Sequence, residues 1–208
     1  MAKNIRGLFP GIWVIIMNKE VATAEESVSI AKAEIIKESQ RIEESSLYSS
    51  KGHFIVAYFW SNFHLVIGIP MVILAAIAGS SFISNDNTTG GILSIIVAIL
   101  SAIMTFLNPN EKAHNHLNVG NNFDSLLNDI RIFRTIDCWQ EDLDRILTER
   151  LKSFSSRKSN LNGGAPQIPW WAYQLAKRGI MSGEGDYKVD KKLPDITDQI
   201  PKSEDKPV

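Results

Sequence analysis

The chain of 208 residues has little cysteine and little net charge, and both shortages exclude classes of protein. A single cysteine, Cys138, excludes an intrachain disulfide and any metal site built from several cysteines. The formal net charge of -1 provides no basic field of the kind that binds nucleic acid. No P-loop, HExxH, GxSxG or paired-cysteine motif occurs. We therefore predict that the chain is not an enzyme and has no catalytic residue, metal, cofactor or direct nucleic-acid partner.

The most informative absence is local. Between Phe63 and Leu107 there is no Lys, Arg or Glu, and Asp86 is the only charged residue, so all 22 Lys and Arg lie outside this window. The mean hydropathy of -0.05 therefore averages one apolar segment with two charged flanks. A helix in the core of a soluble protein seldom keeps charge off every face for this length, so the window favours a bilayer as its solvent.

Two apolar runs make up this window. Residues 63–83 supply the ~20 residues needed to cross a ~30 Å hydrocarbon core, and residues 91–107 lie at the short end of the ~17 to 25 residue range. The segment Asn85 to Gly91 is rich in Asn, Thr and Gly and is long enough only for an antiparallel hairpin. The alternative is a pair of core helices in a soluble protein, since these can also be apolar all round.

Basic residues predict the orientation of this hairpin. The turn carries no Lys or Arg, whereas Lys51 and Lys112 lie beyond the outer ends of the two runs. By the positive-inside rule both termini are expected to be cytoplasmic. The predicted fold class is an all-α membrane protein, with a two-helix transmembrane hairpin (63–107) and cytoplasmic amphipathic helices, and we expect it to be oligomeric.

An N-terminal apolar segment, residues 1–22, superficially resembles a secretory signal because the apolar run 8–17 follows Lys3 and Arg6. Lys19 and Glu20 separate that run from Ala22-Thr23-Ala24, which has the A-x-A pattern of a cleavage site, so we reject a signal sequence. Ten apolar residues are too few to span a bilayer. An interfacial anchor or a packing segment is favoured, and whether residues 8–17 contact the membrane stays open.

The segment 23–62 is predicted to be a cytoplasmic helix that leads into the membrane through an aromatic stretch. Thr23 and Glu26 have the spacing of a capping box, which predicts the start of the helix there. Its apolar seam is narrow and lies between charged faces, which is typical of a helix that docks on a partner or on another copy. The seam consists of Val28, Ala31, Ile35 and Ile42.

After the second run the Asn108-Pro109 step should end or bend the helix. Residues 108–154 are predicted to form cytoplasmic amphipathic helices with a break near residues 137–139. His116 is expected to be a packed or hydrogen-bonded histidine rather than a metal ligand. Residues 155–180 are predicted to be a linker, over 155–165, followed by a short helix that lays aromatic surface on the bundle or the membrane interface, and 181–208 a disordered tail.

Small and hydroxyl-bearing residues share one face of the second apolar run at the helical period. These are Ser94, Ala98, Ser101, Thr105 and Asn108. This face could pack against the first run or line a water-filled pore, and the sequence favours neither. In the first run the small residues Gly68, Ala75 and Gly79 are predicted to serve helix packing. Because two helices cannot enclose water, a pore requires several copies around an axis.

The order of short motifs along residues 23–180 carries a resemblance to a known family. The motifs are Leu47-Tyr48-Ser49-Ser50-Lys51, Gly68-Ile69-Pro70, Leu74-Ala75-Ala76-Ile77-Ala78-Gly79, Asn108-Pro109, the set His116, Gly120, Phe123 and Leu126, and Pro169 to Ala176. In this order they resemble the SLATT family, two-transmembrane effector domains associated with SMODS nucleotidyltransferases and SLOG sensors in bacterial conflict systems. Phe123 departs from the pattern, since Tyr is more usual there.

The resemblance implies a function that spacing alone does not. It implies a pore-forming effector of an antiphage, abortive-infection system in the bacterial inner (cell) membrane, which oligomerises and permeabilises or depolarises that membrane when a partner signals. The partners would be membrane lipid, further copies of the chain, and a cytoplasmic sensor, nucleotidyltransferase or reverse transcriptase of the same system. Two alternatives are a non-pore membrane anchor or scaffold for a soluble sensor or nucleotide-processing enzyme, and an ordinary small-ion channel subunit unrelated to defence.

Overall fold

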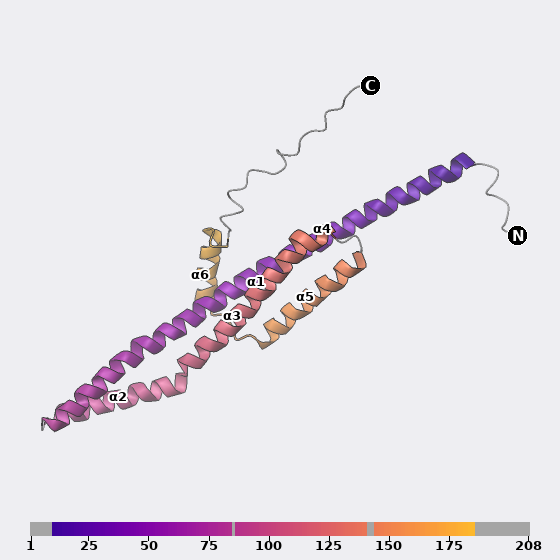
Figure 1. Cartoon of the computed structure of the whole chain (residues 1–208). Helices are drawn as coiled ribbons and strands as arrows, with labels where there is room; N and C mark the ends of the chain where they lie inside the picture. The colour runs from indigo at the N-terminus through magenta and orange to yellow at the C-terminus, as the bar shows by residue number, and fades with distance from the viewer. Residues whose placement is uncertain (1–9, 85, 141–143, 186–208) are drawn as a thin grey trace.

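The computed structural model describes the backbone of residues 10–84, 86–140 and 144–185, and the side chains of these residues except 10–29 and 144. The described chain is helical with no strand, which confirms the predicted all-helical fold (Figure 1). Its elements are α1 (Pro10–Ile83), α2 (Asn87–Leu107), α3 (Pro109–Ile132), a π-helical turn (Phe133–Asp137), α4 (Cys138–Gln140), α5 (Asp144–Gly164) and α6 (Trp170–Met181).

Helix α1 is a single element of 74 residues, which at ~1.5 Å per residue is about 110 Å long. It begins at Pro10, in the first helical turn where a proline removes no hydrogen bond that the helix needs. Thr23 lies in its interior, so the helix start predicted there is wrong, because a capping-box spacing has no effect where the helix already continues on both sides. The predicted segments 1–22 and 23–62 are joined in this helix from Pro10 onward, and residues 1–9 lie outside the described chain.

The turn between α1 and α2 is shorter than the predicted stretch 85–91. The Asp86 side chain accepts a hydrogen bond from the backbone N–H of Thr89 at 3.2 Å, so α2 begins at Asn87. Gly90 is buried in the first turn of α2, and a Cβ there would lie 3.1 Å from the Phe82 ring. The absence of a side chain at Gly90 therefore lets the two helices approach closely beside the turn.

Asn108 forms the joint between α2 and α3 (Figure 1). Its φ of 41° and ψ of 58° place it in the left-handed region, and its backbone N–H donates to the Met104 carbonyl at 3.0 Å. Pro109 then occupies the first position of α3, and the Asn108 amide bonds the Glu111 carboxylate. The Asn108-Pro109 step thus ends α2 at Leu107 as predicted and turns the chain back along α1.

The left-handed backbone at Asn108 predicts an asymmetry between substitutions. Asn108→Val should lower the free energy of unfolding by about 1–2 kcal/mol, because a β-branched side chain is strained at positive φ. Asn108→Gly also loses the bond to Glu111 but relieves the strain, so its effect should be within ~0.5 kcal/mol. Thermal unfolding followed by circular dichroism in detergent measures both, and equal losses would contradict the role of the backbone.

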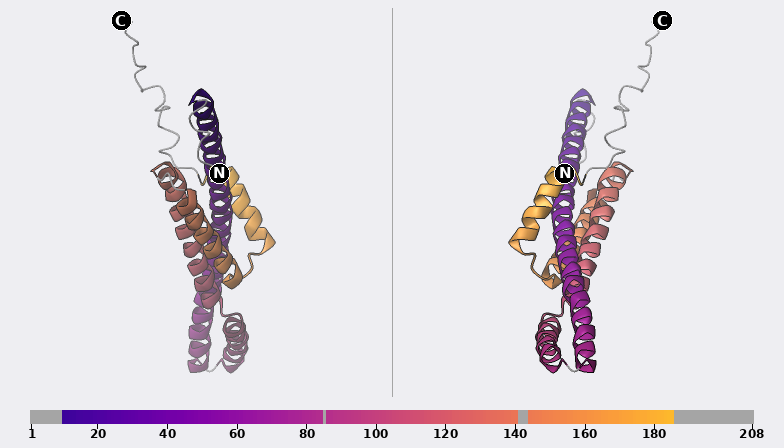
Figure 2. Two further views of the ribbon diagram at one scale, coloured as in Figure 1. Left: turned by 90° about the vertical axis from the view of Figure 1, so that its right-hand side faces the viewer. Right: turned by 90° about the vertical axis from the view of Figure 1, so that its left-hand side faces the viewer.

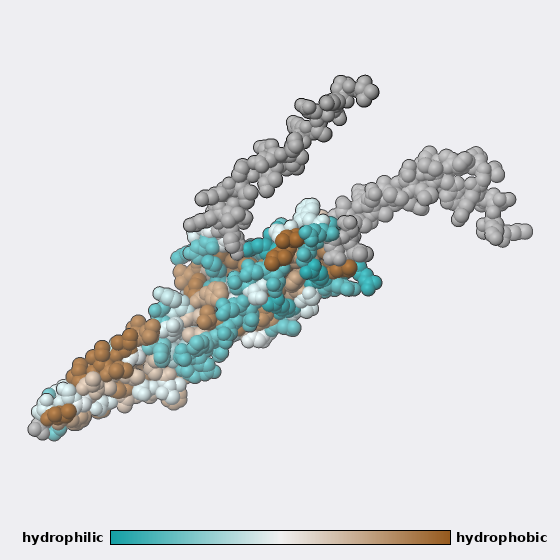
Figure 3. All heavy atoms as spheres, viewed as in Figure 1, coloured by the Kyte–Doolittle hydropathy of each residue, from teal (hydrophilic) through white to brown (hydrophobic). Residues whose placement is uncertain are grey.

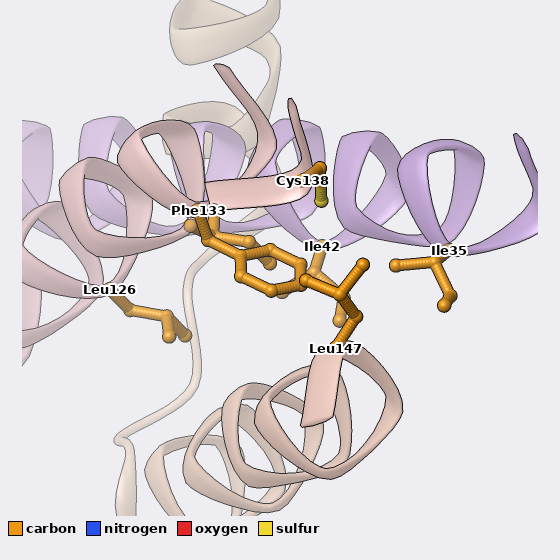
Figure 4. Close-up of a cluster of buried hydrophobic side chains, with 7 residues drawn as sticks. Ile35, Ile42, Leu126, Phe133, Cys138 and Leu147 are labelled. Atoms are coloured by element: carbon orange, nitrogen blue, oxygen red, sulfur yellow. The ribbon is translucent and has the colours of Figure 1, made fainter. Parts of the chain in front are cut away.

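Residues 30–62 of α1 pack with α3 and α5 into what we call the bundle, and Figure 4 shows its core. The core consists of Ile35, Ile42, Leu126, Ile130, Phe133, Cys138 and Leu147, all buried. Phe133, at the start of the π-helical turn, also packs its ring on Phe154 of α5, with centroids 5.4 Å apart. Burial raises the pKa of the Cys138 thiol, which keeps it protonated and unreactive.

Ion pairs hold the three helices of the bundle in register. Glu43 of α1 accepts hydrogen bonds from Arg131 at 3.1 Å and from Arg134 at 2.8 Å, and its side chain is only 15% exposed. Arg157 of α5 pairs with Asp129 and bonds Ser125 of α3 at 3.0 Å. Residues 155–164 are therefore helical rather than the predicted linker, because contacts with α3 outweigh the low helix propensity of their Ser, Asn and Gly residues.

Candidate functional site

The paired ends of α1 and α2, which we call the hairpin (residues 63–107), carry more than half of the large apolar side chains that are exposed among the described residues. Both helices are long and apolar enough to cross a membrane, and only 11% and 6% of their most apolar stretches are buried. A core helix of a soluble protein would be mostly buried. Figure 3 shows hydrophobic residues gathered over this end and hydrophilic residues over the bundle. The exposed apolar residues of the hairpin include Leu65, Val66, Ile69, Val72, Ile73, Ile77, Ile92, Ile95, Ile99 and Phe106.

Two hydroxyls on the small, polar face of α2, those of Ser94 and Thr105, are hydrogen-bonded within the helix. Ser94 Oγ donates to the Gly90 carbonyl at 2.8 Å, and Thr105 Oγ1 donates to the Ser101 carbonyl at 2.9 Å. Ser94 and Ala98 are exposed, as are Ser101, Thr105 and Asn108. These donors therefore leave no unsatisfied group toward lipid, while their oxygens can still accept bonds from water.

A groove of about 690 Å³ separates α1 from α2 near the Asn108 joint. It is lined by His64, Gly68 and Ile69 of α1 and by Ser101, Thr105 and Asn108. The two helices touch at the turn beside Gly90 and lie apart at the joint (Figures 1 and 2). Three of the five predicted pore-lining residues thus face the first apolar run across an open space.

The predicted packing residues of α1 make no tight contact with α2 in one chain. A Cβ at Gly68 or at Gly79 would meet nothing within 4 Å, and Ala75 is exposed. Ala78 is the residue of this stretch that is buried, at 4% exposure. The face that carries Ala75 and Gly79 is therefore open, and its predicted packing role would need a second chain.

The predicted partner seam on α1 is largely used within the chain. Ile35 and Ile42 are buried, at 7% and 3% exposure, in the bundle core against α3 and α5. Ala31 is exposed, and the Val28 side chain lies outside the described ones. Of the seam side chains that the structure describes, only Ala31 is left for a partner, because a narrow apolar stripe can also be covered by helices of its own chain.

Aromatic residues collect where the bundle meets the hairpin. The Lys112 ammonium lies 4.5 Å from the Trp60 ring centroid, a cation–π contact that ties α3 to α1. Phe59 packs on Trp171 of α6 with ring centroids 5.2 Å apart. A Cβ at Gly120 would come within 2.8 Å of the Phe54 ring, so this glycine permits α3 to approach α1 closely. The junction is therefore a tightly packed level of the molecule.

A pair of buried histidines lies just inside this junction. His53 Nδ1 and His116 Nδ1 are 2.9 Å apart, and the two side chains are 2% and 6% exposed. One ring must donate from Nδ1 and the other accept, so the accepting ring is neutral with its proton on Nε2. Burial, with the neighbouring His116, lowers the pKa of His53 to about 4, and burial also lowers the pKa of His116. The ring of His53 stacks on Phe123 at 5.9 Å.

The packed, hydrogen-bonded state predicted for His116 is confirmed, but its partner was not predicted. His53 lies 63 residues away in a stretch with no periodic signal, so only the return of α3 along α1 brings the rings together. Among the side chains that the structure describes, no group of three His, Cys, Asp or Glu could hold a metal ion.

The fold and the site define an all-helical protein with two helices that are long and apolar enough to span a membrane. No protein-family model, curated protein or solved structure matches the chain.

Proposed function

We propose that the chain inserts its hairpin into the bacterial cell membrane with both termini in the cytoplasm, and that several copies assemble into a pore which depolarises the cell. The observation that carries the proposal is the exposure of the hairpin, whose apolar side chains cover both helices. Such a surface is stable in hydrocarbon and costly in water. The basic residues Lys51 and Lys112 lie at the bundle end, which the positive-inside rule places in the cytoplasm.

Assembly of several copies is supported by two faces of the hairpin that a single chain leaves exposed. Two helices cannot enclose water, so conduction needs a ring of hairpins. The exposed face with Ala75 and Gly79 offers the small residues that permit close helix contact in a membrane. The hydroxyls of Ser94, Ser101 and Thr105 supply a weakly polar face that water can wet.

The likeness to SLATT effectors supports a role in defence against phage. On this proposal, a cytoplasmic sensor, nucleotidyltransferase or reverse transcriptase of the same system triggers assembly through the bundle. The non-pore scaffold alternative is weakened, because Ile35 and Ile42 of its docking seam are buried within the chain. Membrane potential during forced expression separates the two functions, since a scaffold leaves the potential unchanged.

The pore predicts currents that depend on the polar face of α2. Purified protein in planar bilayers should conduct, and replacement of Ser94, Ser101 and Thr105 together with leucine should abolish the current, because the lumen then presents only hydrocarbon to water. The matched control replaces Ile92, Ile95 and Ile99, on the other faces of α2, with leucine and should conduct as the wild type does. Full conductance in the serine and threonine variant would refute this lining.

A further inference from the structure

Helix α6 lies across α1 on the side away from α5 (Figures 1 and 2). Ala172 and Ala176, one helical turn apart, are buried at 0% and 2% exposure, and Trp171 and Tyr173 of the same helix pack on Phe59 and Tyr48 of α1. The same helix exposes Trp170 and Met181, each at 75%. Helix α6 thus packs on α1 through small and aromatic side chains, and it still exposes Trp170 and Met181 to a partner.

An apolar groove of about 440 Å³ runs between α6 and α1. It is lined by Ile55, Tyr58, Phe59, Phe63 and Val66 of α1 and by Trp171 and Leu175 of α6, with Asn62 as the one polar residue. The Asn62 amide already donates to the Tyr58 carbonyl at 2.8 Å. The groove is therefore an apolar slot, and it is continuous with the exposed apolar surface of the hairpin through Phe63 and Val66.

The charges that helix α6 itself carries have one sign. Helix α6 contains no acidic residue, and Lys177 and Arg178 are exposed on it without an ion pair among the residues that the structure describes. The nearest acid along the chain, Glu184, pairs with Lys51 at 3.3 Å. Trp171, Leu175 and Arg178 follow at intervals of four and three residues and so share one side of α6. Arg178 thus stands at the edge of the slot that Trp171 and Leu175 line.

We propose that α1 and α6 form a phospholipid-binding site, in which an acyl chain lies in the groove and the headgroup phosphate binds Arg178. The inference rests on the proposed function only in that the hairpin must bring the groove to the bilayer surface. A lipid fits better than a second copy of the chain because the slot continues the surface of the first apolar run and ends at an unpaired guanidinium, which bonds phosphate in a bidentate manner. Exposed Trp170 is also typical of the interfacial region.

Tryptophan fluorescence in vesicles tests the site. A full-length chain with Trp13, Trp60 and Trp139 replaced by phenylalanine reports on Trp170 and Trp171 alone. It is reconstituted into phosphatidylcholine vesicles, with or without phosphatidylglycerol, that contain brominated lipid. Bromine near the headgroup should quench the emission by at least about twofold more than bromine near the chain end, as expected for a helix that lies in the interface.

The headgroup contact has its own variants. Arg178→Glu should reduce the quenching in phosphatidylglycerol vesicles severalfold, and Arg178→Lys should restore part of it because the charge is kept and the bidentate geometry is lost. Lys152→Glu makes the same charge change at an exposed position of α5 and should have no effect. Covalent labelling of an α6 peptide in the wild-type chain by photoactivatable phosphatidylglycerol gives a second measurement that needs no tryptophan substitution.

A third reporter separates failure of the site from failure of the hairpin. In a chain with Trp170 and Trp171 also replaced by phenylalanine, Ile73→Trp places a tryptophan in the middle of the first apolar run, where bromine near the chain end should quench it. Quenching of this reporter without quenching or labelling of α6 would overturn the lipid site but would still support insertion of the hairpin into the membrane. Absence of quenching at Ile73→Trp would overturn membrane insertion itself. Quenching of α6 that varies with the ratio of protein to lipid would assign the groove to a contact between copies.

Discussion

Replacement of Ile130 with alanine should lower the free energy of unfolding of the bundle by about 2–5 kcal/mol. Ile130 is 0% exposed and lies in the core formed by α1, α3 and α5, where the chain has little material to collapse into the vacated space. Thermal unfolding in detergent, followed by circular dichroism, measures the loss. Protease cleavage within the bundle should rise in parallel, because packing on this core is what holds α5 in place.

The same substitution two residues later provides the control. Ile132 is 52% exposed on α3, so Ile132→Ala removes the same atoms from a position that buries few of them. Its effect should stay within ~0.5 kcal/mol. A loss at Ile132 as large as that at Ile130 would mean that the exposed side of α3 is covered in the protein, for example by another copy.

Acidification should weaken the junction between the bundle and the hairpin. In the folded chain the pKa of His53 is about 4, below its ordinary value of 6.5, because the ring is buried beside His116. The unfolded chain therefore binds more protons between these values, so stability is fully present above pH 6.5 and is lost as pH falls toward 4. The shift from 6.5 to about 4 corresponds to a loss of roughly 3 kcal/mol of stability once the pH is below 4.

Substitutions identify the histidine pair as the origin of this pH dependence. His53→Gln cannot titrate, so the unfolding free energy measured against pH should lose the part of its slope that His53 contributes, while His116, whose pKa burial also lowers, keeps its own part. His114→Gln, an exposed position on α3, should leave the slope unchanged. If the slope persisted in His53→Gln and vanished in His114→Gln, the buried pair would not be the titrating group.

Features that depend on local sequence could be predicted. The ends of the apolar runs at Ile83 and Leu107 follow from charge and hydropathy, since each run ends where polar residues begin. The joint at Asn108 follows from the restriction that Pro109 imposes on the residue before it. The stripe of Ser101, Thr105 and Asn108 follows from the helical period, and the structure places all three along one groove.

Features that depend on contacts between distant segments could not be predicted from the sequence. Nothing in the sequence near His53 indicates that His116 will lie against it. Nothing near Glu43 indicates that it will pair with Arg131 of α3 and Arg134 of the π-helical turn. The polar stretch 155–165 has the composition of a linker, yet Arg157 and the partly buried Leu161 hold it as helix against the rest of the bundle. A narrow apolar seam such as that of Ile35 and Ile42 has the same sequence pattern whether it packs against another protein or against helices of its own chain.

The two limbs of the hairpin differ in how they are attached. The first limb is the end of α1, one continuous helix of 74 residues that also runs through the bundle and contains Pro70, whereas the second limb meets the bundle at the Asn108 joint. A tilt of the bundle would therefore reach the first limb through continuous helix backbone, which is weakened at Pro70, and the second limb only through the single residue Asn108. Because the limbs are in contact beside Gly90 and Phe82 and lie apart at the joint, such a tilt should change the width of the groove between them.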